Sequence, residues 1–255
     1  MKALILAAGY AVRLHPLTVN TPKPLLEVGG KKIIDRIINT LSVLNDLDDI
    51  YVVTNSRFYN NFIEWSEASD FKKKLSVIDD GTSTNDTRLG AIRDMEFVIK
   101  QRSINEDLLV IAGDNLFDMD IKAFMDFASP KKDGVSVALH DVASLDAARL
   151  YGVVSIDKAG KVLEFEEKPP EPKSTLISTG IYYFPREYVL GIEKYLKAEG
   201  AKNDAPGYYI KWLSKSNTVY GYPFSEKWYD IGDIESYKKA DAEYKKRESN
   251  KNGNA

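Results

Sequence analysis

The sequence predicts an α/β fold built on a doubly wound, mostly parallel but mixed sheet. Two observations support this prediction. In the first half of the chain, apolar runs of strand length alternate four times with segments of helical spacing, which is typical of parallel sheets with helices on both faces. In the second half, strands are more frequent than helices and two of them are joined by a tight turn, which indicates antiparallel additions to the sheet.

The first predicted strand is the continuous apolar run Ala3–Ala8, as expected for a strand buried on both faces. Apolar residues recur at helical spacing over Lys32–Leu44, which predicts the first helix. The later elements of this half are predicted strands at Asp49–Thr54, Leu75–Ile78 and Leu108–Ala112 and predicted helices at Asn60–Ala68, Thr87–Gln101 and Ile121–Ser129.

In the second half, the predicted strands are Gly134–His140, Gly152–Ile156, Val162–Glu166, Thr179–Phe184 and Thr218–Tyr222, and the predicted helices are Arg186–Glu199, Tyr208–Ser214 and Ile234–Arg247. No linker or internal repeat divides the chain. We therefore expect one domain over residues 1–247, followed by a polar, disordered tail at residues 248–255.

Composition excludes several functional classes. The 255-residue chain contains no cysteine, which excludes thiol catalysis and cysteine metal sites. Its net charge of −3 offers no basic excess for nucleic acid, and no apolar stretch approaches the roughly 18 residues of a membrane span. The short apolar run at the N-terminus lacks the features of a signal peptide. We expect a soluble, cytoplasmic protein that binds neither nucleic acid nor membrane.

The segment Gly9–Lys23 directly follows the first predicted strand. Gly9 lets the backbone approach a phosphate, Arg13 offers a planar fork of donors, and Lys23 offers a point charge. The segment matches neither the Walker pattern nor G-x-G-x-x-G. From these residues alone, a phosphate-binding loop and a solvated turn are equally supported.

Two further polar groups follow strands. Asp114 comes directly after the buried strand Leu108–Ala112, where a carboxylate can hold Mg²⁺ beside phosphate oxygens or cap the next helix; the residues alone favour the cap. The charged stretch Glu166-Glu167-Lys168 alone is typical of an exposed strand end. Since ligands of open α/β sheets lie beyond the carboxyl ends of the strands, Gly9, Asp114 and the segment 79–81 are expected at one crevice.

Four motifs in order resemble the signature of the sugar-1-phosphate nucleotidylyltransferases. The first is Leu6-Ala7-Ala8-Gly9 followed by Arg13-Leu14, Pro16-Leu17-Thr18 and Pro22-Lys23-Pro24-Leu25-Leu26. The others are Gly113-Asp114-Asn115, Glu166-Glu167-Lys168-Pro169 and Trp228-Tyr229-Asp230-Ile231-Gly232. The resemblance implies a Rossmann-like nucleotidyltransferase fold, with a nucleotide-binding part at about residues 1–130 and a sugar-binding part at about 131–247.

The resemblance also implies roles for individual residues. The implied catalytic residues are Arg13, Lys23, Asp114 and Lys168. The implied nucleotide-binding residues are Leu6, Ala7, Ala8, Gly9, Arg13, Lys23, Asp80 and Gly81. The implied ligands of a Mg²⁺ cofactor are Asp114 and Asp230. The implied sugar-binding residues are Asn115, Tyr151, Gly152, Glu167, Lys168, Thr179 and Gly180.

The implied reaction joins a nucleoside triphosphate to a sugar 1-phosphate and releases pyrophosphate. Residues 150–183 look closest to the glucose-1-phosphate thymidylyltransferases, which favours dTTP or UTP. The family's usual Q-x-x-P-x-G-L-A-x-A run is missing at residues 79–90, so the base remains open. The alternatives are a cytidylyltransferase for another phosphorylated alcohol such as phosphocholine, a non-catalytic sensor of nucleotide or sugar phosphate, and an NAD-binding oxidoreductase.

The sequence departs from the signature at Ala11 and Val12, where the family has glycine and threonine or serine. Neither replacement adopts positive φ at low cost, which predicts altered phosphate contacts in this loop. Longer relatives have a C-terminal β-helix acyltransferase domain, and without hexapeptide repeats in the sequence we expect no such activity. The oligomeric state cannot be read from the sequence, and a homo-oligomer is compatible with it.

Overall fold

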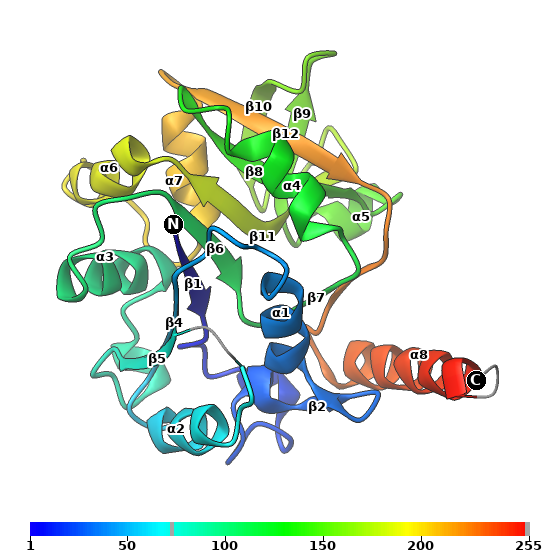
Figure 1. The fold of residues 1–255 in the computed structure, drawn as a ribbon. Helices are drawn as coiled ribbons and strands as arrows, with labels where there is room; N and C mark the ends of the chain where they lie inside the picture. Colours follow the sequence, from blue (N-terminus) through cyan, green and yellow to red (C-terminus); the bar gives the residue numbers. More distant parts are fainter. Residues whose placement is uncertain (72–73, 253–255) are drawn as a thin grey trace.

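The computed structural model describes residues 1–71 and 74–252. It confirms a mixed sheet between two layers of helices (Figure 1). At its centre, β1 (Lys2–Leu6) pairs in parallel with β4 (Asp49–Thr54) and β6 (Leu108–Ala112), and β4 pairs in parallel with β5 (Lys74–Asp79). This part of the sheet is the parallel one that the strand–helix alternation predicts.

The second half of the chain extends the sheet beyond β6. Strand β11 (Leu176–Phe184) runs antiparallel to β6, and it also pairs with β8 (Gly134–Asp141) and β9 (Gly152–Ile156). The outer strands are β10 (Val162–Glu167), which pairs with β9, and β12 (Thr218–Phe224), which pairs with β8. The sheet is therefore mixed, as the change of character in the sequence indicates.

The helices are α1 (Ile33–Leu41), α2 (Tyr59–Glu67), α3 (Ala91–Gln101), α4 (Ile121–Ala128), α5 (Leu145–Ala148), α6 (Arg186–Leu196), α7 (Pro206–Leu213) and α8 (Ile234–Asn252). Short 3-10 turns lie at Val12–Leu14, Lys23–Leu25 and Asn85–Thr87. Two small pairings lie outside the main sheet, namely β2 (Glu27–Val28) with β3 (Lys31–Lys32) and β7 (Asn115–Phe117) with β13 (Trp228–Asp230).

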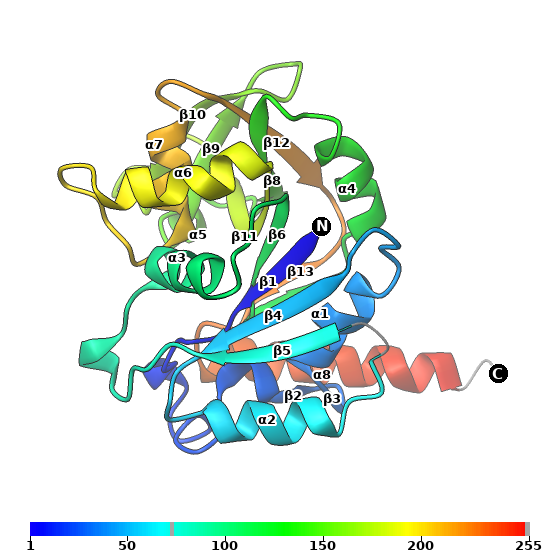
Figure 2. The ribbon, with the colours of Figure 1, turned by 60° about the vertical axis from the view of Figure 1, so that its left-hand side comes forward.

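Each face of the sheet has its own core, because successive side chains of a strand point to opposite faces. Ala3 and Ile5 of β1 belong to a core shared with α1, α2 and α4, whereas Leu4 belongs to the core under α3, α6 and α7. All three side chains are fully buried. Figure 2 shows α3, α6 and α7 on one side of the sheet and α1, α4 and α8 on the other.

Helix α8 begins with a reciprocal cap. Asp233 accepts a hydrogen bond from the Ser236 amide at 2.8 Å, and the Ser236 hydroxyl lies 3.0 Å from the Asp233 amide. The predicted end of this helix at residue 247 is wrong. The helix continues through Asn252, so residues 248–252 are helical, while residues 253–255 of the expected tail lie outside the described residues.

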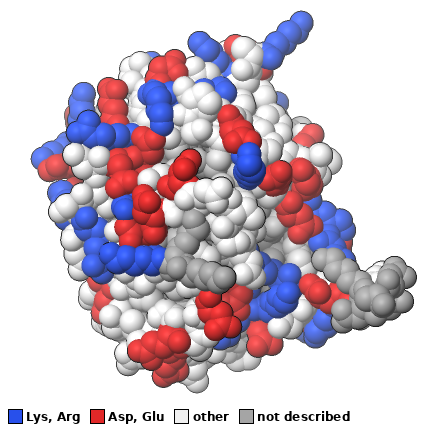
Figure 3. Space-filling view, viewed as in Figure 1, with Lys and Arg blue, Asp and Glu red and all other residues white. Residues whose placement is uncertain are grey.

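Both signs of charge are interspersed on the face of the molecule in Figure 3. No helix within the described residues has the length and apolar character needed to cross a membrane.

Candidate active site

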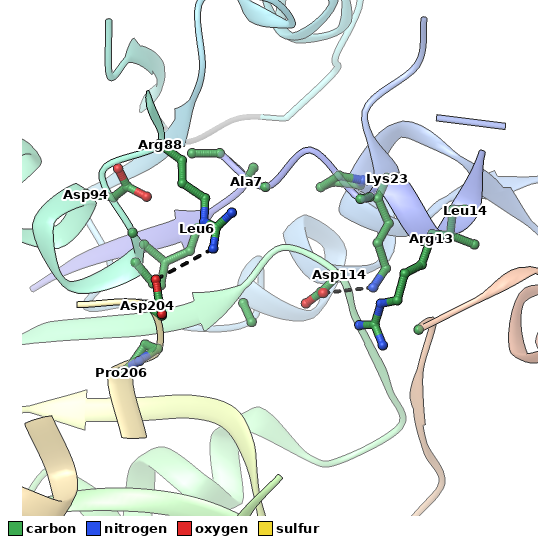
Figure 4. A pocket seen from close by; sticks show the side chains of 18 residues that line it. Leu6, Ala7, Arg13, Leu14, Lys23, Arg88, Asp94, Asp114, Asp204 and Pro206 are labelled. Atoms are coloured by element: carbon green, nitrogen blue, oxygen red, sulfur yellow. Dashed lines mark hydrogen bonds and ion pairs between the residues drawn. The ribbon is translucent and has the colours of Figure 1, made fainter. Parts of the chain in front are cut away.

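A cleft of about 330 Å³ opens at the carboxyl ends of β1 and β6 (Figure 4). The predicted residues Leu6, Ala7, Ala8 and Gly9 follow β1 and line this cleft. It also receives Arg13, Lys23 and Asp114, so the structure gathers the predicted phosphate-binding loop and the predicted metal ligand in one place. The lining is completed by Ala11, Leu14, Pro24, Arg88, Gly90, Ala91, Asp94, Ala112, Asp204, Pro206 and Gly232.

Gly113 explains how Asp114 reaches the cleft. Its amide donates a hydrogen bond to the Leu6 carbonyl oxygen at 2.8 Å, and an added Cβ at this position would lie 2.8 Å from the same oxygen. Glycine therefore lets the chain after β6 stay close to the end of β1. Asp114 follows directly and points into the cleft beside Lys23 (Figure 4).

The pairing of β7 with β13 brings Asp230 to the same point. Asp230 lies opposite Asn115 in this two-stranded ladder, and Asn115 directly follows Asp114. Lys23 Nζ lies 2.8 Å from Asp114 Oδ2 and 3.7 Å from Asp230 Oδ1. One ammonium thus lies between two carboxylates that are far apart in the sequence.

The pKa values of the two carboxyl groups are shifted in opposite directions. Desolvation acts to raise the pKa of Asp114, but the nearby Lys23 charge and hydrogen bond outweigh it, so this pKa lies below its usual value. Burial raises the pKa of Asp230, followed by repulsion from Asp114, and the attraction of Lys23 opposes both. Asp114 is therefore the more readily ionised member of the pair.

The two carboxylates fit a divalent cation. Mg²⁺ is commonly held in proteins by one or two carboxylates together with phosphate oxygens and water. Within the described residues there is no group of three or more side chains of metal-ligating type, so the protein alone does not offer a complete cage. A positively charged ammonium already lies between the two carboxylates, which demonstrates a cation-binding position.

At the departure from the signature, Ala11 takes a positive φ. Ala11 adopts the left-handed conformation with φ 46° and ψ 43°, which glycine would adopt at lower cost. Its carbonyl oxygen accepts hydrogen bonds from the Thr18 hydroxyl at 2.8 Å and the Leu14 amide at 3.0 Å. Val12 is exposed, and Arg13 is exposed at the lip of the cleft.

A second pair of carboxyl groups, Asp94 and Asp80, lies at the opposite end of the cleft, and only Asp94 lines it. Asp94 of α3 lines the cleft wall and is 5% exposed, and burial followed by the proximity of Asp80 raises its pKa to about 8. Asp80 is also buried, and its Oδ1 accepts hydrogen bonds from the amide and the hydroxyl of Thr82, both at 2.7 Å. Asp80 and the neighbouring Gly81 follow β5, behind this wall, and are not among the residues that line the cleft.

Among the residues with predicted sugar contacts, Glu167 lies near the cleft. Its Oε2 would be 1.8 Å from a Cβ added at Gly207 and 3.0 Å from one added at Gly152, which places the carboxylate between these two glycines. Gly207 follows Pro206, which lines the cleft. Burial raises the pKa of Glu167, opposed by Lys168 and Lys211.

Lys168 and Tyr151 are held together by the backbone. Lys168 is exposed, has φ 49°, and donates its amide hydrogen to the Tyr151 carbonyl oxygen at 2.9 Å. The Tyr151 ring lies edge-on to Trp228, with ring centroids 5.2 Å apart. The pKa of Tyr151 is raised by burial and by the Asp230 carboxylate, with which its hydroxyl interacts.

Three predicted sugar-binding residues make contacts inside the protein. The Asn115 side chain is buried and donates to the Thr179 carbonyl oxygen at 2.6 Å, and it accepts a hydrogen bond from the Trp228 indole at 2.8 Å. The Thr179 hydroxyl donates to the Ala138 carbonyl oxygen at 3.0 Å. A Cβ on Gly180, which has φ 78°, would lie 3.1 Å from Asn115 Nδ2. Contact of these residues with a sugar remains a prediction.

Sequence reasoning missed several residues of the cleft. Asp94 lies on the buried side of α3 beside Met95, where an apolar residue is expected, and an acidic residue in an apolar stripe is the signal that could have identified it. Arg88, which the sequence left open as a phosphate- or base-binding residue or a surface charge, pairs with Asp204 at 3.8 Å (Figure 4). Asp204 and Pro206 come from the segment before α7, which has no motif of its own.

Comparison with known proteins agrees with this geometry. The family model described as "Nucleotidyl transferase" matches residues 2–247. The chain is 33% identical over 236 residues to the bifunctional protein GlmU of Methanococcus aeolicus, which covers 91% of this chain and 51% of that protein. It is 30% identical over 252 residues to a glucose-1-phosphate adenylyltransferase of Thermosipho africanus, which covers 92% of this chain and 59% of that protein.

A crystal structure described as a glucose-1-phosphate thymidylyltransferase from Bacillus anthracis, in complex with a sucrose, is also similar. Its TM-score is 0.83 at 28% identity, and the match covers 96% of this chain and 95% of that one. The chain spans between about half and three fifths of the length of the two curated relatives. With its α/β sheet, its loop after β1 and its paired carboxylates, and with a family model that matches residues 2–247, the chain belongs to the nucleotidyl transferase family.

Proposed function

We propose that this protein transfers a nucleoside monophosphate from a nucleoside triphosphate to a sugar 1-phosphate, giving a nucleotide sugar and pyrophosphate. The observation that supports it best is the Asp114–Asp230 pair with Lys23 between the two carboxylates, at the carboxyl ends of the central strands. Such a position suits the triphosphate of a nucleotide and the divalent cation that accompanies it. The cytoplasmic location expected from the sequence remains a prediction.

In the proposed reaction, an oxygen of the sugar phosphate attacks the α-phosphorus in line, and pyrophosphate leaves. The attacking phosphate is already an anion at neutral pH, so the protein contributes position and charge rather than a general base. Arg13, at the lip of the cleft, would bind the leaving pyrophosphate, and Lys23 and Lys168 would bind the other phosphates. A bound Mg²⁺, held by Asp114 and Asp230, would supply charge neutralisation at the α-phosphate.

For the sugar we propose that Glu167 and Lys168 bind the hydroxyls and the phosphate of glucose 1-phosphate. Glu167 is partly buried between Gly152 and Gly207, so its carboxylate can accept hydrogen bonds from hydroxyl groups. For the nucleotide, the resemblance favours dTTP or UTP. The similar adenylyltransferase makes ATP a required comparison.

The test is pyrophosphate release with Mg²⁺ in a matrix of substrates. We would combine dTTP, UTP, CTP, ATP and GTP with glucose 1-phosphate, other sugar 1-phosphates and phosphocholine. Pyrophosphate release with one nucleoside triphosphate and one sugar 1-phosphate would support the proposal. Turnover only with phosphocholine would identify a cytidylyltransferase for another phosphorylated alcohol. Tight nucleotide binding without pyrophosphate release in any combination would favour a non-catalytic sensor of nucleotide or sugar phosphate.

A further inference from the structure

Lys23 has an unusual environment for a lysine. It is 8% exposed and is the only buried lysine or arginine within residues 1–71 and 74–250. Its Nζ lies 2.8 Å from Asp114 and 3.7 Å from Asp230, while the Asp114 side chain is 44% exposed toward the cleft. The ammonium thus fills the position between the two carboxylates from the protein side, and the cleft side stays accessible.

Two cations cannot occupy this position together. Mg²⁺ binds oxygen ligands at about 2.0–2.1 Å, so a metal bridging both carboxylates would occupy the space of the ammonium. Removing a buried ammonium from its carboxylate partners is costly unless another anion receives it. A divalent cation alone brings no such anion, whereas a nucleoside triphosphate does.

The neighbouring cation differs from Lys23. The side chain of Arg13 also lines the cleft but makes no ion pair or hydrogen bond with the part of the chain that the structure describes. Arg13 can therefore bind a phosphate at once, while Lys23 must first leave its carboxylates. Its four-carbon stem gives the ammonium the freedom to turn toward a phosphate oxygen.

We propose that Lys23 is a tethered counter-ion that blocks the Asp114–Asp230 metal position until a triphosphate arrives. When a triphosphate binds, the ammonium turns to one of its phosphate oxygens, and Asp114 and Asp230 become free to hold the divalent cation. The cation and the nucleotide consequently bind in a coupled manner, and the protein without nucleotide has little affinity for Mg²⁺. This inference rests on the proposed function of the site, but its test needs no turnover.

The first experiment counts Mn²⁺ bound to nucleotide-free protein by electron paramagnetic resonance. We compare the wild type with Lys23→Met, which keeps the apolar stem, and with Lys122→Met, which removes an exposed lysine that pairs with Asp126 on α4. Lys23→Met should bind Mn²⁺ at least about tenfold more tightly than the wild type, because the competing ammonium is gone. Lys122→Met should match the wild type, and adding Asp114→Asn to Lys23→Met should abolish the gain.

Equal Mn²⁺ affinity in the wild type and Lys23→Met would overturn the proposal, as would a gain that survives Asp114→Asn. A second measurement uses the wild type alone, in case Lys23→Met folds poorly. Millimolar Mg²⁺ should leave the thermal unfolding midpoint unchanged, and Mg²⁺ with inorganic tripolyphosphate should raise it above either addition alone. A rise with Mg²⁺ alone, or no added rise with both, would also overturn it.

The two proposals can fail separately. Tighter Mn²⁺ binding by Lys23→Met with no productive substrate pair would reject the reaction and keep the counter-ion. A productive substrate pair, together with an unchanged Mn²⁺ affinity in Lys23→Met, would support the reaction and reject the counter-ion role of Lys23.

Discussion

Two pairs of carboxyl groups lie at opposite ends of the cleft, and one member of each pair, Asp114 and Asp94, lines it. At the phosphate end, Asp114 and Asp230 share the Lys23 ammonium, and the pKa of Asp114 lies below its usual value. At the other end, no ion pair joins Asp80 or Asp94 to a cation within the described residues. Burial is the main cause that raises both pKa values, and the charge of Asp80 adds to the effect at Asp94. The pKa of Asp114 is thus lowered beside an ammonium, whereas that of Asp94 is raised to about 8 beside another carboxyl group.

The difference follows from what lies between the carboxyl groups. Like charges in a buried site cannot both be ionised without a compensating cation, so an unaccompanied pair retains a proton. A site that keeps two negative charges needs a cation, and Lys23 supplies it in the protein without ligand. A pair that keeps one proton carries one negative charge instead of two.

The largest expected effect comes from removing charge at the phosphate end. Asp114→Asn should lower kcat for the productive substrate pair by at least about a hundred-fold, because the lost charge is aimed at the reacting phosphate. Pyrophosphate release measures this effect. Asp126→Asn, which removes an exposed carboxylate on α4, serves as the control and should retain full activity. A wild-type rate in purified Asp114→Asn would reject the assignment of this carboxylate.

The next largest effect concerns Asp94 and is measured as a change in the free energy of unfolding. The pKa of Asp94 is raised from 3.8 to about 8, so the folded state holds a proton that the unfolded state releases. Its stabilising contribution is complete below about pH 4 and is lost as the pH rises toward 8. The Asp94→Asn variant has no titratable group at this position. As the pH rises, the wild type should therefore lose about 1.4 kcal/mol of unfolding free energy per pH unit relative to the Asp94→Asn variant. The difference between the two proteins should change by roughly 2.7 kcal/mol between pH 5 and 7.

Urea unfolding of both proteins over this pH range measures the difference. Asp86→Asn is the control, since Asp86 is an exposed carboxylate in the same connecting segment. Parallel pH profiles for Asp94→Asn and the wild type would mean that Asp94 is ionised in the folded protein, and the contrast between the two pairs would disappear.

Predictability from sequence also differs between the two ends of the cleft. The phosphate end follows strands that apolar runs reveal, and strands at Asp49–Thr54 and Leu108–Ala112 were predicted with the bounds that the structure has. The contact of Asp114 with Asp230 could not be derived from spacing, because β7 and β13 have three residues each and show no periodicity. Only the resemblance to the family implied that Asp114 and Asp230 lie close together.

The sequence did not predict the end of the cleft that Asp94 lines. Helix α3 was expected from Thr87, but a 3-10 turn over Asn85–Thr87 and Gly90 with φ 86° delay its start to Ala91. The helical pattern identifies Asp94 as a position in the apolar stripe but does not say why an acid stands there. Its partner, Asp80, lies across a contact between a loop and a helix that no local pattern specifies.

The partly buried carboxylate of Glu167 tests whether sugar binding depends on charge. Glu167→Gln keeps the shape but weakens hydrogen bonds from sugar hydroxyls. We expect the KM for the sugar phosphate to rise by about tenfold, with a smaller change in kcat, if these contacts form in the ground state and the transition state alike. Steady-state kinetics with varied sugar phosphate measure the change. Glu164→Gln, at an exposed position on the same strand, should leave both constants unchanged, and an unchanged KM in Glu167→Gln would remove Glu167 from the sugar site.

The smallest effect concerns the loop that brings Arg13 and Lys23 to the phosphate end. Ala11 has φ 46°, a conformation that costs an alanine roughly 1–2 kcal/mol, whereas glycine adopts it freely but loses more entropy on folding. Ala11→Gly should therefore raise the free energy of unfolding by about 0.5–1 kcal/mol, which corresponds to a midpoint rise of about 2 °C. Ala143→Gly, at φ 54° outside the cleft, is the matched control and should give a similar gain. If Ala143→Gly stabilises the protein and Ala11→Gly does not, then contacts of the Ala11 methyl group, rather than backbone strain, determine the loop that presents both cations to the carboxylate pair.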